Sequence, residues 1–76
     1  MLYATDSDSQ YSVGGDFLRG SDGFKQDFKK ADKYLQLAAD QGHADAQYTI
    51  GMMAFKGEGM AAPDYAKALT YFKLVS

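Results

Sequence analysis

Apolar and small residues recur every three or four positions along four segments of the chain, a spacing that places them on one face of an α-helix. The clearest segment runs from Ala44 to Lys56. Its apolar stripe consists of Ala46, Ile50, Gly51 and Ala54. A second stripe follows Asp64 and consists of Ala68, Tyr71, Phe72 and Val75. Because no alternating pattern of a strand competes, the chain is predicted to be helical over roughly two-thirds of its length.

Residues that begin and end helices stand at the edges of these segments. Gly57-Glu58-Gly59 ends the helix before it, since glycine accepts the left-handed conformation of a helix C-terminus. Asp64 is a good N-cap, because its carboxylate can accept a hydrogen bond from an amide of the first turn. The first half of the chain has the same plan, with predicted caps at Asp6 and Asp27. Its stripes consist of Ser9, Val13, Gly14 and Phe17, and of Ala31, Tyr34, Leu35 and Ala38.

The two halves of the chain match one another at a shift of 37 residues. This shift gives ten identities in 39 pairs, whereas unrelated sequences of average composition would give roughly two or three. The identities include the pairs Gln10/Gln47, Tyr11/Tyr48, Gly14/Gly51, Asp27/Asp64 and Tyr34/Tyr71. Such a period is typical of a solenoid, in which each unit buries its apolar face against its neighbour. The predicted fold is therefore all-α, an α–α superhelix of two antiparallel helix–turn–helix repeats.

Gly14 and Gly51 lie in the middle of predicted helices, where glycine costs ~1 kcal/mol relative to alanine. Close approach of the second helix of the same repeat, at Ala31 or Ala68, would offset this cost. We therefore expect the two helices of each repeat to be closest at these glycines.

The stretch that joins the repeats, from Ala38 to Gln47, resembles the inter-repeat signature of the Sel-one-like repeat (SLR) family, a relative of the tetratricopeptide repeats. Further hallmarks are Ile50-Gly51, Gly57-Glu58-Gly59-Met60, Asp64-Tyr65-Ala66-Lys67-Ala68 and Tyr71-Phe72. The resemblance covers nearly the whole chain, from about Asp6 to Val75. Ala54 departs from the pattern, because the family usually has an aromatic residue there.

The resemblance implies a right-handed, tetratricopeptide-like solenoid that acts as a non-catalytic adaptor for protein–protein contacts. On this basis residues 1–76 form one domain, with a first repeat at about 6–42 and a truncated second repeat at about 43–76. The truncation leads us to expect a piece of a longer array. The resemblance leans towards bacterial exported or periplasmic proteins, and no signal peptide is visible in this piece.

A candidate binding surface lies on the outer side of the first helix of each repeat, the side that lines the concave face of tetratricopeptide-like solenoids. Residues within about 100° of one another on a helical wheel give the candidates Tyr11, Leu18, Arg19, Asp45, Tyr48, Met52, Phe55 and Lys56. Aromatic, Met and Arg residues are typical of protein interfaces. The alternative is that Leu18, Met52 and Phe55 simply pack against a neighbouring helix.

Composition argues against several other functions. A net charge of −2 gives no reason to expect nucleic-acid binding, which needs clustered Lys and Arg. There is no cysteine, and the single histidine, His43, has no second His or Cys with which to bind a metal, so it is expected to cap a helix or face solvent. Asp6-Ser7-Asp8-Ser9 lacks the glycine and distal glutamate of a calcium loop, so these acids are expected to stabilise a helix N-terminus. No apolar run is long enough for a membrane span.

The predicted function is a scaffold that holds a partner protein or peptide, without a catalytic residue, cofactor or metal. Two alternatives stay open: a structural spacer between domains, and a small-molecule-binding or hydrolytic Sel-one-like protein. The second needs a nucleophile paired with a base, and the sequence offers no such pair. Self-association through apolar repeat ends is also expected. The residues predicted at these ends are Tyr71, Phe72 and Val75 on one side and Leu2 and Tyr3 on the other.

Overall fold

The computed structural model describes residues 6–20, 23 and 25–75, and this part of the chain is built from α-helices. The helices are α1 (Ser7–Arg19), α2 (Phe28–Asp40), α3 (Ala44–Lys56) and α4 (Tyr65–Leu74). They contain 73% of the described residues, which include no strand. The all-α fold class predicted from the periodicity is confirmed.

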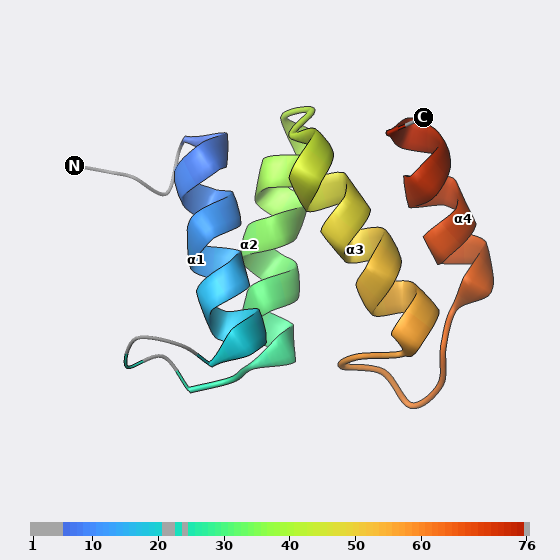
Figure 1. Ribbon diagram of the computed structural model, residues 1–76, viewed down its shortest axis with the longest axis horizontal. Coiled ribbons are helices and arrows are strands. Elements are labelled where there is room, and N and C mark those ends of the chain that lie inside the picture. Colours follow the sequence, from blue (N-terminus) through green and yellow to red (C-terminus); the bar gives the residue numbers. More distant parts are fainter. Residues whose placement is uncertain (1–5, 21–22, 24, 76) are drawn as a thin grey trace.

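The helices follow one another across the molecule in a single row, and their direction alternates along it (Figure 1). α2 packs against α1 within the first repeat and against α3 of the second, while α4 packs against α3. The molecule extends 36 × 25 × 13 Å, so it is flat and only a helix pair thick. In such a row an inner helix has neighbours on both sides, whereas an outer helix has a neighbour on one side only.

The predicted caps position these helices. The carboxylates of Asp6, Asp27 and Asp64 accept hydrogen bonds from amides in the first turns of α1, α2 and α4. At the opposite ends of α1 and α3, Gly20 and Gly57 have φ angles of 70° and 78°, a left-handed conformation that costs glycine little. Each repeat therefore turns back on itself where the sequence predicts it to turn.

Gly14 and Gly51 lie tightly against the second helix of their own repeat, and large side chains make the nearest contacts. A Cβ atom at Gly14 would lie 2.7 Å from Cγ of Leu35, and one at Gly51 would lie 2.7 Å from Cε1 of Phe72. Ala31, one of the two expected alanines, also comes near, since its carbonyl oxygen lies 3.2 Å from the position of a Cβ at Gly14. Helical side chains lean towards their N-terminus, so the large residue one turn later covers the turn that carries the alanine.

The core lies where the two repeats meet. Leu35 of α2 and Ile50 of α3 are its largest fully buried side chains. The remaining core residues are Ala31, Ala38, Ala39, Ala46 and Met53. In α4 only Ala68 is buried, and Tyr71, Phe72 and Val75 of its predicted inner stripe are half-buried. Among the described residues, the second repeat is therefore less deeply buried than the first.

Candidate protein-interaction face

Aromatic and aliphatic side chains gather on the outer side of α3 and α4. Tyr48, Phe55, Tyr65 and Leu69 are 52%, 52%, 63% and 55% exposed, and Phe72 is half-buried between them. The rings of Tyr48 and Phe72 lie 5.7 Å apart, and those of Phe55 and Tyr65 lie 5.6 Å apart edge to face. We call these five residues the α3/α4 face. They pack as ring pairs and still leave about half of their larger side chains open to solvent.

A shallow hollow of about 310 Å³ lies in the middle of this face. It is lined by Phe55, Tyr65, Ala68, Leu69 and Phe72. The helical period explains the arrangement, since residues 65, 69 and 72 follow one another at intervals of four and three along α4 and therefore share one side of it. The only small residue in the lining is Ala68, and it leaves room between the rings.

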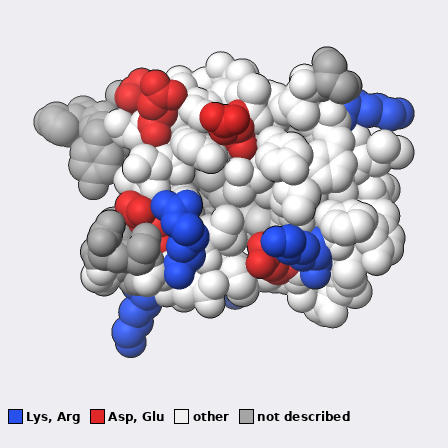
Figure 2. Space-filling view, in the orientation of Figure 1, with Lys and Arg blue, Asp and Glu red and all other residues white. Residues whose placement is uncertain are grey.

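Charged groups stand at the two ends of α3 beside this face. Asp45 lies in the first turn of α3 and Lys56 in its last turn, and both are exposed. Each charge is favourable towards the helix dipole at its own end. Met52 is half-buried between them. Over α4 most of the surface carries neither Lys and Arg nor Asp and Glu (Figure 2), so the face is an apolar area with charges at its margin.

The equivalent surface of the first repeat is covered. Tyr11, 37 positions before Tyr48, stacks on the ring of His43 with 4.8 Å between ring centres. Leu18 and Phe28, the equivalents of Phe55 and Tyr65, are packed against the core. Leu35, the equivalent of Phe72, is 0% exposed. The equivalents of these ring positions are therefore covered in the first repeat, whereas the positions themselves are exposed in the second.

The eight residues predicted to bind a partner lie in two different environments. Tyr11 and Leu18 contact the second repeat or the core, as above, and Arg19 is exposed with its guanidinium 3.4 Å from the Asp16 carboxylate. The residues on the outer side of α3 are Asp45, Tyr48, Met52, Phe55 and Lys56. The structure thus brings the second-repeat candidates together, and their role in binding stays a prediction.

The sequence reasoning did not include the α4 half of this face. Tyr65 and Leu69 were not proposed as partner-binding residues, and Phe72 was assigned to the buried stripe and to a repeat end. One signal was present: Leu69 corresponds to Asp32 in the first repeat, so this exposed position is charged in one copy and apolar in the other. The predicted end residues Leu2 and Tyr3 lie outside the described residues.

His43 is the most connected polar side chain between the repeats. Its Nδ1 accepts a hydrogen bond from the amide of Ala46 at 3.2 Å, so His43 caps α3 as expected. Its Nε2 lies 2.9 Å from the carboxylate of Asp8. With Nδ1 as an acceptor, this hydrogen-bond network assigns the ring proton to Nε2, which donates to Asp8. Nδ1 therefore caps α3 and Nε2 joins α3 to α1, so both ring nitrogens are engaged in hydrogen bonds.

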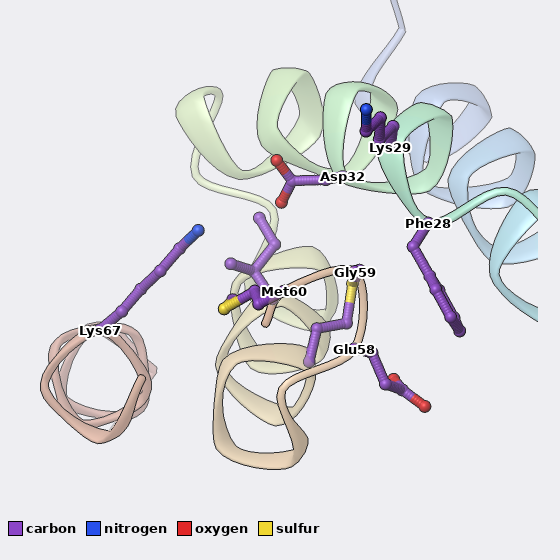
Figure 3. A pocket seen from close by; sticks show the side chains of 9 residues that line it. Phe28, Lys29, Asp32, Glu58, Gly59, Met60 and Lys67 are labelled. Atoms are coloured by element: carbon purple, nitrogen blue, oxygen red, sulfur yellow. The ribbon is translucent and has the colours of Figure 1, made fainter. Parts of the chain in front are cut away.

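A second, smaller hollow of about 130 Å³ lies between α2, α4 and the loop after α3. Its apolar lining comes from Phe28, Ile50, Met53 and Met60. Lys67 of α4 and Asp32 of α2 point towards one another across its mouth (Figure 3). Sites for small molecules usually measure roughly 300–1,000 Å³, so this hollow is smaller than such sites usually are.

Metal binding and membrane insertion are two further possibilities for the described residues. Residues 6–20, 23 and 25–75 contain no group of three or more His, Cys, Asp or Glu side chains placed to hold a metal ion. No helix within these residues combines the length and the apolar character needed to cross a bilayer.

Paired antiparallel helices that repeat every 37 residues define a short α-helical repeat protein. The family model of the Sel1 repeat matches residues 7–43 and 44–74, so the chain belongs to the Sel1 repeat family, the one that its sequence resembles. Repeats of this family generally mediate protein–protein interaction and are typically non-catalytic. Searches of curated proteins and of solved structures gave no match.

Proposed function

We propose that this chain is a non-catalytic protein-interaction module and that a partner protein binds to the α3/α4 face. One observation carries the proposal: Tyr48, Phe55, Tyr65 and Leu69 gather on one face, and each is more than half exposed. The exposed rings of Tyr48, Phe55 and Tyr65 are of the residue types that dominate binding energy at interfaces. Asp45 and Lys56 would form the polar rim that such interfaces have.

The alternative of a spacer predicts a different surface. A spacer needs packing within and between repeats, and Tyr11 and Leu18 satisfy that need in the first repeat. It gives no reason for an exposed position that is charged in the first repeat to carry a large apolar residue in the second. The exposed Leu69, for which the first repeat has Asp32, therefore supports the interaction module over the spacer.

The experiment is a selection of peptides from a random library against the wild-type chain at low protein concentration. Affinities of the selected peptides are then compared between wild type, Phe55→Ala and Leu37→Ala. Leu37 is the matched control, since it is an apolar residue of α2 that is 41% exposed away from the face. Loss of an interface anchor costs about 2 kcal/mol, or roughly 30-fold in affinity. We expect this loss for Phe55→Ala only; equal affinity of both variants would contradict the proposal.

A further inference from the structure

The smaller hollow lies at the junction of the two repeats. It is bounded by α2 of the first repeat and by α3, α4 and the loop between them of the second. It shares no lining residue with the α3/α4 face, because Lys67 lies on the side of α4 opposite to Tyr65 and Leu69. The hollow is therefore formed by packing between the repeats and is separate from the proposed interaction face.

The floor of this hollow is apolar and can adapt its shape. Ile50 and Met53 are 1% and 3% exposed, and Phe28 and Met60 are half-buried. Methionine side chains adjust to the outline of the group that they contact. The volume of about 130 Å³ is close to that of a cavity of about 150 Å³ that binds benzene. The side chain of leucine has fewer carbon atoms than benzene, so the floor has room for an aliphatic group of this size.

Two opposite charges face one another at the mouth of the hollow. Lys67 of α4 and Asp32 of α2 point towards one another, whereas Lys29 and Glu58 point away (Figure 3). Lys67 and Asp32 are half-buried, and their side chains form no hydrogen bond or ion pair among the described residues. A half-buried charge without a partner is unfavourable. The mouth therefore favours a ligand that carries one charge of each sign, close together.

An aliphatic α-amino acid combines these features, since its ammonium and carboxylate groups flank the carbon that carries the side chain. We propose that the hollow binds a free amino acid of this kind, such as L-leucine. The ligand carboxylate accepts hydrogen bonds from Lys67, the ligand ammonium donates to Asp32, and the side chain covers the floor. Both ion pairs remain partly open to solvent and are therefore weak, so Kd lies in about the millimolar range. This site goes beyond the proposed function.

Two other states of the hollow would give different results. In one, Lys67 and Asp32 form an ion pair with each other and close the mouth, so no amino acid enters. In the other, the floor receives an apolar side chain of a partner protein, which has no free ammonium or carboxylate group beside it. Only the amino-acid site requires both ligand charges, and derivatives that lack one of them separate the three states.

The experiment is a titration of the isotope-labelled chain with L-leucine up to about 50 mM, followed by amide chemical shifts. Saturable changes are expected at Asp32, Gly59, Met60 and Lys67. N-acetyl-L-leucine lacks the ammonium group and L-leucinamide lacks the carboxylate, so each should bind roughly three- to fivefold more weakly. L-alanine leaves most of the floor uncovered and should bind roughly tenfold more weakly.

Two variants assign each ligand charge to its residue. Lys67→Gln should weaken binding of L-leucine roughly three- to fivefold and leave that of L-leucinamide unchanged. Asp32→Asn should weaken binding of L-leucine to the same extent and leave that of N-acetyl-L-leucine unchanged. Lys25→Gln, in an exposed loop, is the control and should behave as wild type. A variant that merely disturbs the fold would weaken all three ligands alike, so the matched pattern reports direct contact.

The inference is overturned if the amides around the hollow show no saturable change with L-leucine. It is also overturned if both derivatives bind as tightly as L-leucine does, because the hollow would then take an apolar side chain without regard to charge. Phe55→Ala, on the α3/α4 face, should bind L-leucine as wild type does. Failure of the amino-acid site therefore leaves the proposed function of that face standing, and the reverse also holds.

Discussion

Adjacent glycines in α1 provide the sharpest test of the packing. A Cβ at Gly14 would lie 2.7 Å from Cγ of Leu35 and 3.2 Å from the carbonyl oxygen of Ala31. Leu35 is 0% exposed, and the carbonyl belongs to helical backbone, so neither atom can move aside cheaply. The three atoms nearest to a Cβ at Gly15 all belong to the guanidinium of Arg19, the closest at 3.0 Å, and Arg19 is exposed and can turn away.

These contacts determine whether each Gly→Ala substitution raises or lowers the free energy of unfolding. Alanine gains about 1 kcal/mol over glycine within a helix, and overpacking of a filled core costs about 1–3 kcal/mol. The net loss for Gly14→Ala should therefore be up to about 2 kcal/mol, which corresponds to a fall in Tm of up to about 8–16 °C for a domain of this size. Gly15→Ala should instead gain about 0.5–1 kcal/mol, since only the helix propensity changes.

The assay is urea unfolding followed by far-UV circular dichroism, with wild type, Gly14→Ala and Gly15→Ala measured side by side. Both variants have the same composition and differ only in which glycine becomes alanine, so each is the control for the other. If both substitutions stabilise the chain, or both destabilise it to the same extent, α1 and α2 are not packed as described.

Two further substitution sets follow from burial and capping. Ile50→Ala should cost about 2–4 kcal/mol by leaving a cavity in the core, whereas Tyr48→Ala, at a residue 52% exposed, should cost about 1 kcal/mol or less from the lost ring contact; thermal melts of equal Tm for the two would contradict this. Asp27→Ala should cost about 1 kcal/mol, because the carboxylate accepts from the amides of Lys29 and Lys30, while Asp27→Asn should keep most of the stability, and the same urea assay measures both.

Much of the fold could be predicted from local signals. The caps at Asp6, Asp27 and Asp64 and the turns at Gly20 and Gly57 depend on a few neighbouring residues, so the sequence alone placed the helix ends well. The contacts between helices were harder. Ala31 was expected opposite Gly14 and does contact it through its carbonyl oxygen, but the side chains nearest to Gly14 and Gly51 are those of Leu35 and Phe72. The direction in which a side chain leans is not visible in the spacing of apolar residues.

The α3/α4 face also depends on contacts between helices, which the sequence alone does not predict. Tyr11 and Tyr48 occupy equivalent positions, and their repetition suggested a shared binding role. In the structure Tyr11 stacks on His43 while Tyr48 is half exposed. Their environments differ because α3 follows the first repeat within the described chain. The burial of each tyrosine is therefore set by the neighbouring repeat and not by the tyrosine itself. The helical wheel of α3 predicted the α3 half of the face. Tyr65 and Leu69 of α4 could be added only from the structure, which shows how α4 packs beside α3.

We propose that a partner binds to the α3/α4 face and not to α1 or α2. The most direct measurement is a map of amide chemical shifts of the isotope-labelled chain, titrated with a selected peptide at a protein concentration where the chain is monomeric. The account predicts that the shifts which change lie around Tyr48, Phe55, Leu69 and Phe72 and that those of α1 stay unchanged. Changes confined to α1 and α2, with α4 unaffected, would contradict it.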